Sequence, residues 1–302
     1  MNPKTILSIS VLMLFFVSRS LAQDTTDIMK QLEKEMGKSE KEQTLYTTAT
    51  FKTTRLINGH SVENTGKRVM DVKISHRFEK LNEGFYNLFG LDEARMRFGF
   101  DYGLTDNLMV GIGRSTYQKT YDVFLKFRIL RQSRGKKNMP FTLSYVPTFA
   151  IRTLKVYTVG ISNDFASSAS YTHQLIIGRK FSDNTSLQIM PTYVHRHLIT
   201  LNTDPDDVFA IGIGGRQKLT KRISLNAEYY YQVTRHQSAG TNNLLSIGFD
   251  LETGGHVFQL HFTNSQAMNE SNFIAGTNGN WGKGDILFGF NISRVFTLGK
   301  KH

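Results

Sequence analysis

Residues 98–115 read FGFDYGLTDNLMVGIGRS, and two alternating runs in this stretch decide the fold. Phe98, Phe100 and Tyr102 alternate with small or charged residues, and the alternation resumes after the polar residues 105–107. Period two on both sides of a short polar turn predicts a β-hairpin. A soluble sandwich would turn the aromatic face inward, whereas a membrane barrel would turn it outward, to lipid.

Residues 1–22 have the features of a secretory signal peptide, with Lys4 near the start, an apolar run over 6–17, and small residues before Gln23. We expect Gln23 to begin the mature chain. No later segment approaches 18 consecutive apolar residues, so we expect no membrane-spanning helix. The sequence has no cysteine. An exported chain of this size is therefore held by something other than disulfides, and a hydrogen-bonded sheet meets that need.

The composition fits a barrel. The chain has 22 Phe, 12 Tyr and one Trp, a mean hydropathy of −0.30 and a formal net charge of +12. A negative hydropathy is compatible with a membrane barrel because only alternate residues meet lipid. The basic excess lies in residues 67–302 and accompanies no nucleic-acid motif. It favours contact with anionic outer-membrane lipids, lipopolysaccharide included, or a passage for small anionic solutes, and it predicts no nucleic-acid partner.

The alternation continues to the end of the chain and predicts twelve strands, an even number as in single-chain outer-membrane barrels. These segments are 70–78, 96–104, 108–112, 121–129, 141–149, 171–177, 187–193, 209–213, 223–231, 245–251, 258–262 and 286–296. Three-residue connections such as 105–107 and 182–184 alternate with long ones such as 79–93 and 264–283, as periplasmic turns alternate with outer loops. We therefore predict an all-β, closed antiparallel transmembrane β-barrel in the outer membrane of a Gram-negative bacterium, with its N-terminus periplasmic.

Three segments follow from this organisation: a signal peptide over 1–22, an N-terminal tail over 23–66, and the barrel over 67–302. In the tail, residues 24–43 form a short charged helix, interpreted as a linker or as a partner-binding element. The threonine-rich residues that follow are strand-like but are interrupted by Gly59 and Gly66. We place them as a cap or inner plug under the barrel.

The second face of the strands carries charges. A charge in the middle of the bilayer costs about 2–4 kcal/mol, so these side chains must face the lumen. The predicted lumen-lining residues are Lys73, Arg77, Arg95, Arg97, Asp101, Lys126, Arg128, Arg152, Arg196, Arg216, Glu228 and Asp250. Because basic residues outnumber acidic ones in this set, an open lumen would favour anionic solutes.

Several stretches resemble a known family. ISHRF at 74–78, the segment 88–115, DLETGGHVFQLHFTNSQAMNE at 250–270 and GDILFGFNISRVF at 284–296 are similar to an uncharacterised β-barrel family, a domain of unknown function, from Bacteroidetes outer membranes. The resemblance extends from about Ala49 to Phe296. It implies a location and a fold, and it transfers no site residue because the motifs carry no known chemistry.

Signals for catalysis are weak. His236 and Ser238 resemble the His-x-Ser of the twelve-stranded outer-membrane phospholipase, and Asn242 would have to orient the histidine. The rest of that enzyme's pattern is absent, so a solvated loop is favoured and no catalytic residue is assigned. His195 and His197 share a strand face but show no further ligand for zinc. The glycine-rich stretches 212–216 and 276–284 open no helix, so no nucleotide, metal or other cofactor is expected.

Three hypotheses remain. The first is a narrow channel or transporter with a basic lumen. The second is a structural or binding barrel whose lumen is filled by side chains, without transport. The third is a lipid hydrolase that uses Ser238 and His236. The sequence leaves the transported solute and the oligomeric state open.

Overall fold

The computed structural model describes residues 28–30, 32–35, 43–155, 157, 164–197, 206–234 and 240–299, so the predicted signal peptide lies outside the described residues. The chain forms two compact units. In the smaller unit, residues 28–30 and 32–35 are helical, which confirms the short N-terminal helical segment, and β1 (Thr44–Tyr46) pairs with β6 (Ser133–Gly135). The larger unit, residues 47–132 and 140–302, contains the barrel.

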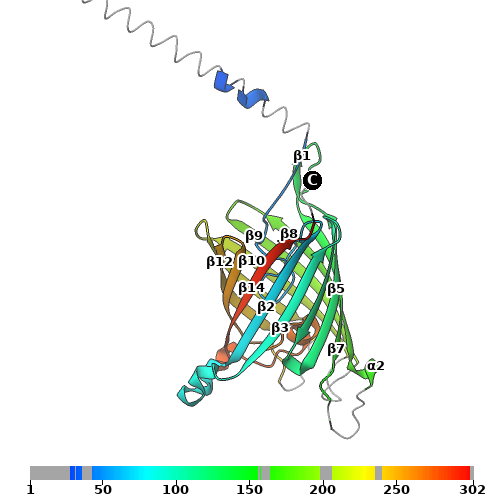
Figure 1. The fold of residues 1–302 in the computed structure, drawn as a ribbon, viewed down its shortest axis with the longest axis vertical. Helices are drawn as coiled ribbons and strands as arrows, with labels where there is room; N and C mark the ends of the chain where they lie inside the picture. Colours follow the sequence, from blue (N-terminus) through cyan, green and yellow to red (C-terminus); the bar gives the residue numbers. More distant parts are fainter. Residues whose placement is uncertain are drawn as a thin grey trace, which may run out of the picture. The chain divides into compact units, whose positions relative to one another are not determined.

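The larger unit is a closed barrel in which every strand pairs with its neighbours in antiparallel register (Figure 1). Its strands are β2 (Val69–Lys80), β3 (Ala94–Gly103), β4 (Leu108–Ser115), β5 (Thr120–Leu130), β7 (Thr142–Arg152), β8 (Ala169–Lys180), β9 (Thr185–Arg196), β10 (Asp207–Lys218), β11 (Ile223–Gln232), β12 (Leu244–Thr253), β13 (His256–Thr263) and β14 (Leu287–Thr297). β14 pairs with β2 and closes the sheet. The predicted closed barrel is confirmed strand by strand, and closure leaves no edge that lipid would deprive of hydrogen bonds.

The tight turns at one end of the barrel share one hydrogen-bond pattern. Leu104 N donates to Leu108 O at 3.0 Å, and the hydroxyl of Thr105 accepts from Leu108 N at 3.0 Å. The turn over 181–185 and the turn over 219–223 repeat this arrangement, with Ser182 and Thr220 supplying the hydroxyl. A hydroxyl that satisfies turn N–H groups explains why LTDN, FSDN and LTKR recur between strands.

The opposite end carries longer connections with short helices. These are η1 (Leu81–Glu83), η2 (Phe85–Gly90), η3 (Tyr117–Lys119), α2 (Phe165–Ser168), α3 (Glu270–Ala275) and η4 (Trp281–Lys283). No helix in the described part of the chain is long and apolar enough to cross a membrane.

The side chains of the strands are oriented as the alternation predicts. Phe100 and Ile112, paired across β3 and β4, are 45% and 55% exposed on the outer surface, whereas Asp101, next to Phe100 on β3, is fully buried. Outward basic residues lie against aromatic rings: Arg114 over Tyr121 and Arg294 over Phe296, at 5.4 and 4.9 Å from the ring centroids. The apolar surface therefore faces outward and the ionic surface faces the lumen.

Candidate functional site

Residues 50–65, called the inner plug from here on, lie inside the barrel. Phe51, Leu56, Ile57 and Val62 are at most 2% exposed although they belong to no strand, and His60 is fully buried. The side chains that bury them come from β2, β5, β9, β11, β13 and β14. The lumen is thus occupied by the chain's own N-terminal segment.

The inner plug reverses direction in a tight turn. Arg55 and His60 form an antiparallel bridge, and Leu56 N donates to Gly59 O at 2.8 Å. A side chain at Gly59 would overlap the hydroxyl of Tyr230, so the turn can approach β11 only with glycine at this position. The Asn58-Gly59 pair, a common turn signal, therefore also allows close packing against the wall.

The carboxylate of Glu228 binds the tip of this turn. It accepts hydrogen bonds from the main-chain N–H groups of Asn58 and Gly59 at 2.8 and 3.1 Å. The side chain of Asn58 accepts from Arg77 Nη2 at 2.8 Å and donates to Ser246 Oγ at 2.9 Å. Three strands of the wall thereby fix the position of the turn.

Wall side chains also satisfy the carbonyl groups of the inner plug. Lys126 Nζ donates to the carbonyls of Thr54, Ser61 and Glu63 at 2.9, 3.0 and 3.0 Å. Further carbonyl groups accept from amide side chains of the wall, namely Leu56 O from Gln259, Ile57 O from Asn291 and His60 O from Gln188. A buried irregular segment needs such partners because an unpaired backbone group in the interior is costly.

Hydrogen bonds and ion pairs connect the inner plug to the wall and to the connection between β13 and β14. Lys73 bridges Asp71 and Asp101, and the hydroxyl of Thr54 bonds to Asp101 Oδ2 at 2.7 Å. Arg55 Nη1 lies 2.7 Å from Glu270 Oε1, and the same oxygen lies 3.1 Å from His60 Nε2. Charge pairing on both sides of the plug compensates for the removal of these groups from water.

Burial and nearby charges shift the pKa values of His60 and Glu270 in this cluster. Burial, together with the cationic Arg55 and Lys126, lowers the pKa of His60 to about 3, so His60 is neutral at ordinary pH. Burial by itself would raise the pKa of Glu270, but the charge of Arg55 and the contact with His60 hold it below its usual range. Glu270 therefore stays ionised beside Arg55 through the physiological range.

A long connection also turns into the barrel. The stretch 264–277, called the inward loop from here on, includes α3, and Phe273 and Ile274 of that helix are fully buried. The strand pattern predicts an outer loop over 264–283 and gives no sign of this burial. The Arg55–Glu270 pair joins the inward loop to the inner plug, so the lumen is filled from both ends.

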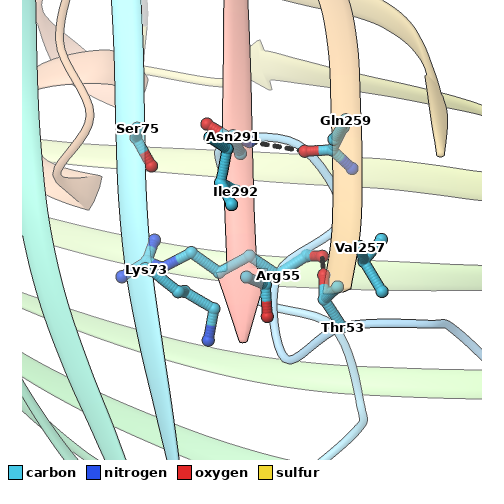
Figure 2. A pocket seen from close by; sticks show the side chains of 9 residues that line it. Thr53, Arg55, Lys73, Ser75, Val257, Gln259, Asn291 and Ile292 are labelled. Atoms are coloured by element: carbon cyan, nitrogen blue, oxygen red, sulfur yellow. Dashed lines mark hydrogen bonds between the residues drawn. The ribbon is translucent and has the colours of Figure 1, made fainter. Parts of the chain in front are cut away.

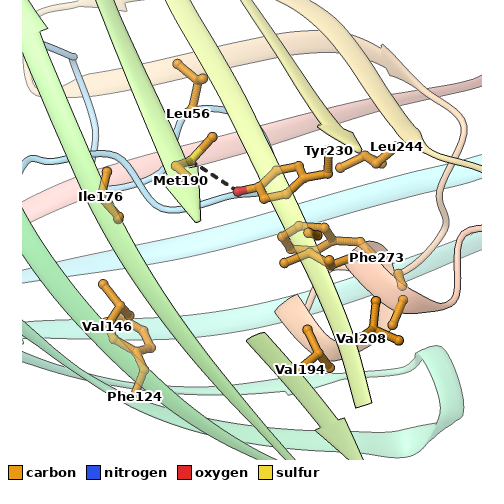
Figure 3. Close-up of a cluster of buried hydrophobic side chains, with 14 of the residues drawn as sticks. Leu56, Phe124, Val146, Ile176, Met190, Val194, Val208, Tyr230, Leu244 and Phe273 are labelled. Atoms are coloured by element: carbon orange, nitrogen blue, oxygen red, sulfur yellow. Dashed lines mark hydrogen bonds between the residues drawn. The ribbon is translucent and has the colours of Figure 1, made fainter. Parts of the chain in front are cut away.

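One side of the lumen is apolar. The alternation along the strands, which predicts a charged inner face, does not indicate this. Figure 3 shows Leu56 of the inner plug and Phe273 of the inward loop among apolar side chains of the wall. The wall members of this cluster are Met109, Phe124, Val146, Ile176, Met190, Val194, Val208, Ala210, Tyr230 and Leu244. Runs such as LII at 175–177, apolar on consecutive residues, were the available signal, because they indicate strands buried on both faces.

The opposite, polar side contains cavities beside the inner plug. A cavity of about 400 Å³ opens at the end that carries the tight turns, and its lining includes Lys52, Asp71 and Glu252. A smaller pocket of about 20 Å³ shares Thr53, Val257 and Ser293 with it. Figure 2 shows Arg55 and Lys73 at this pocket, with Asn291 hydrogen-bonded to Gln259 across it. A polar path therefore enters along β2, β13 and β14 and narrows at Arg55 and Lys73.

The predicted lumen residues fall into two groups. Eight are at least 95% buried in the lumen, namely Lys73, Arg77, Arg97, Asp101, Lys126, Arg216, Glu228 and Asp250. Four lie nearer the rims: Arg95, Arg128, Arg152 and Arg196. Arg95 lies 3.8 Å from Glu79 and its side chain is 40% exposed, while Arg152 and Arg196 line a cavity of about 40 Å³ beside the inward loop. Most of the predicted lumen-lining side chains therefore have specific partners, and they do not form a lining of unpaired basic groups.

The structure gives little support to a hydrolase site. His236 and Ser238 lie outside the described residues. Asn242 is engaged elsewhere: its main-chain N–H donates to Thr277 O at 2.7 Å, and its side-chain amide donates to Asn278 O at 3.0 Å. His195 Nδ1 lies 2.6 Å from Asp207, and no cluster of three metal-ligating residues occurs in the described ranges.

The fold and the site define a membrane-bound β-barrel whose lumen is occupied by its own inner plug and inward loop. The chain belongs to the family of the membrane bound beta barrel domain DUF5777, whose sequence matches residues 51–296. This confirms the β-barrel family inferred from the sequence motifs, and the bacterial group of origin stays a prediction. The match begins at Phe51, so the inner plug is part of the family's domain.

Solved barrels of similar architecture are distant in sequence. The KdgM porin has a TM-score of 0.45 and 9% identity, over 75% of this chain and 99% of that one. Omp33 of Acinetobacter baumannii has a TM-score of 0.43 and 9% identity, over 76% of this chain and 99% of that one. No curated protein matches the chain. The family assignment rests on the sequence match alone.

Proposed function

We propose that the protein is an outer-membrane channel that its inner plug closes at rest, and that small anionic solutes pass when the plug moves. The observation that carries this proposal is the polar path beside the plug, which narrows at the small pocket lined by Arg55 and Lys73. On this side the plug contacts the wall through hydrogen bonds and ion pairs, which water can replace. Movement of the plug would leave a wall that is compatible with a water-filled bore.

The proposed location has separate support. The first 22 residues are typical of an exported chain, and the barrel surface carries an exposed apolar belt. Outer-membrane barrels have short turns on the periplasmic side and longer loops outside. By that rule the turns at 104–107, 181–185 and 219–223 are periplasmic, the N-terminus lies on the same side, and the belt contacts outer-membrane lipids with lipopolysaccharide in the outer leaflet.

The anion preference of the proposed channel depends on the charged side chains of the barrel wall. Lys126 is bound by carbonyl oxygens of the inner plug, and Arg77 is bound by oxygens of Asn58, Asn291 and its neighbour His76. Departure of the plug would leave Lys126 with no plug carbonyl and Arg77 with fewer acceptors. Glu228 and, in the inward loop, Glu270 would lose their plug partners as well. We expect the opened path to favour anions because basic residues outnumber acidic ones in the predicted lumen-lining set.

Weakening the apolar contacts that hold the inner plug tests whether the plug closes the proposed channel. Leu56 and Val62 are each at most 2% exposed, and truncation of such a side chain costs about 1–5 kcal/mol. We expect the Leu56→Ala/Val62→Ala variant to open more often than the natural chain in planar bilayers, with a reversal potential in a KCl gradient that indicates anion preference. Leu104→Ala, at a 45% exposed position in a turn, is the control. Cation preference in the open state would contradict the proposed solute class.

A second candidate is a filled barrel without transport. The observation that favours it is the apolar cluster between the wall, Leu56 and Phe273, because its exposure on plug movement would be unfavourable. In that case neither the natural chain nor the loosened variant conducts. The same bilayer measurement therefore separates the two candidates.

The hydrolase alternative has its own test. We expect the purified barrel to release no fatty acid from phospholipid vesicles, and Ser238→Ala to leave that baseline unchanged, because Asn242 is bound to other loop residues. The measurement is fatty-acid release with calcium present. Hydrolysis by the natural chain that Ser238→Ala abolishes would establish an enzyme instead.

A further inference from the structure

The β2–β3 connection projects a group of apolar side chains from the barrel. In residues 85–91, called the apolar tip from here on, Phe85 is 79% exposed and Tyr86 is 95% exposed. Leu88, Phe89 and Leu91 are each 40–49% exposed. Figure 1 shows this connection extending past the rim beyond the ends of β2 and β3. Large apolar side chains gathered in one exposed loop mark an interaction surface.

The base of the connection is fixed to the barrel. Lys80 lies 3.2 Å from Asp285, and Asn82 donates to the same carboxylate at 3.1 Å. A side chain at Gly90 would come within 2.6 Å of the main chain at Glu79 and Lys80, so the end of η2 packs tightly on β2. The tip therefore extends from a rigid support.

The tip itself has a defined conformation. Phe89 N donates to Gly84 O at 2.8 Å, and Leu91 N donates to Leu88 O at 3.2 Å. Leu88 and Phe89 have φ values of 45° and 53°, in the left-handed region that bulky residues seldom adopt. Strain of this kind persists where the surrounding structure imposes it and is common at sites of function. Here it keeps both side chains exposed.

The lipid-facing surface of the barrel continues toward the tip. Phe78, two residues before the end of β2, stacks on Phe288 at 5.8 Å between ring centroids, and Phe262 lies 5.7 Å from Phe288. This aromatic group lies on the outer surface at the same end as the tip. Phenylalanine, tyrosine and leucine beside acidic and basic neighbours are typical of segments that enter the membrane interface.

We propose that the apolar tip inserts into the interface of the outer leaflet and anchors the β2–β3 connection to lipid. The aromatic group of Phe78, Phe262 and Phe288, on the outer surface at the same end of the barrel as the tip, favours lipid over a protein partner. The inference rests on the membrane-bound barrel and is independent of whether the lumen conducts.

Fluorescence quenching tests this proposal. Tyr86→Trp is placed in a Trp281→Phe background, which makes it the only tryptophan, because the chain has one Trp. The mature protein is reconstituted in phosphatidylcholine vesicles whose acyl chains are brominated near the interface. Glu93→Trp in the same background is the matched control, since Glu93 lies in the same connection with its side chain 69% exposed.

We expect brominated lipid to quench Tyr86→Trp several-fold more strongly than Glu93→Trp, and soluble acrylamide to show the reverse order. Equal quenching of the two reporters by brominated lipid would overturn the proposal. A Phe85→Ser/Tyr86→Ser/Phe89→Ser variant gives a second readout. An oligomer of the natural chain in detergent that this variant dissociates would also overturn the proposal, by assigning the tip to a second copy.

Discussion

A barrel carrying Val62→Cys and Gly178→Cys is expected to lose all conductance when the two cysteines are oxidised and to regain it on reduction. A side chain at Gly178 on β8 would place its Cβ 3.4 Å from Cβ of Val62 in the inner plug. Disulfides join Cβ atoms about 3.5–4.5 Å apart, so the pair can close with little movement. The natural chain has no cysteine, so no other disulfide competes.

The physical reason for this effect is that the bond would fix the inner plug to the wall. The pocket at Arg55 and Lys73 has a volume of about 20 Å³, so in the proposed channel a solute would pass only when the plug shifts. The readout is single-channel current before and after reduction, with mass spectrometry reporting the state of the bond. The single variants Val62→Cys and Gly178→Cys are controls and should conduct in both conditions. Natural conductance in the oxidised double variant would show that solutes do not need plug movement.

The second large effect is expected in stability. Asp122→Asn should lower the free energy of unfolding by about 3–5 kcal/mol, because it leaves the guanidinium of Arg97 buried without its counter-ion. Arg97 and Asp122 are 1% and 2% exposed, and Arg97 Nε donates to Asp122 Oδ1 at 3.0 Å. Gly99 and Gly113 border the guanidinium, and a Cβ at either position would lie within 3 Å of it, so the site is shaped around this side chain.

Urea unfolding in detergent or lipid measures this loss. Asp183→Asn is the control, since its side chain is 96% exposed beside Lys180, and it should unfold as the natural chain does. Replacing both members of the buried pair, as Arg97→Leu/Asp122→Leu, should recover part of the loss because no uncompensated charge remains. If Asp122→Asn unfolds at the same urea concentration as the natural chain, the pair does not stabilise the wall.

The sequence by itself determined the barrel wall. Period two, as in Phe98, Phe100 and Tyr102, assigns each residue to a face, and the cost of a charge in lipid decides which face is outward. The recurring turns LTDN, FSDN and LTKR mark one end of the strands. These signals are local, so they can be recognised in the sequence without knowledge of any contact between distant segments. They also predict which charges face the lumen, and eight of these side chains are nearly fully buried in the structure.

Only the tertiary structure decided what occupies the lumen. Alternation states that Lys126 and Glu228 point inward, but it does not state that their partners are main-chain groups of the inner plug. Arg55 and Glu270 are 215 residues apart in sequence, and neither flanking pattern predicts their ion pair. The apolar tip depends likewise on how the β2–β3 connection packs. The physical reason is that a strand's periodicity encodes its orientation, whereas the contents of a closed cylinder depend on contacts between segments that no local pattern connects.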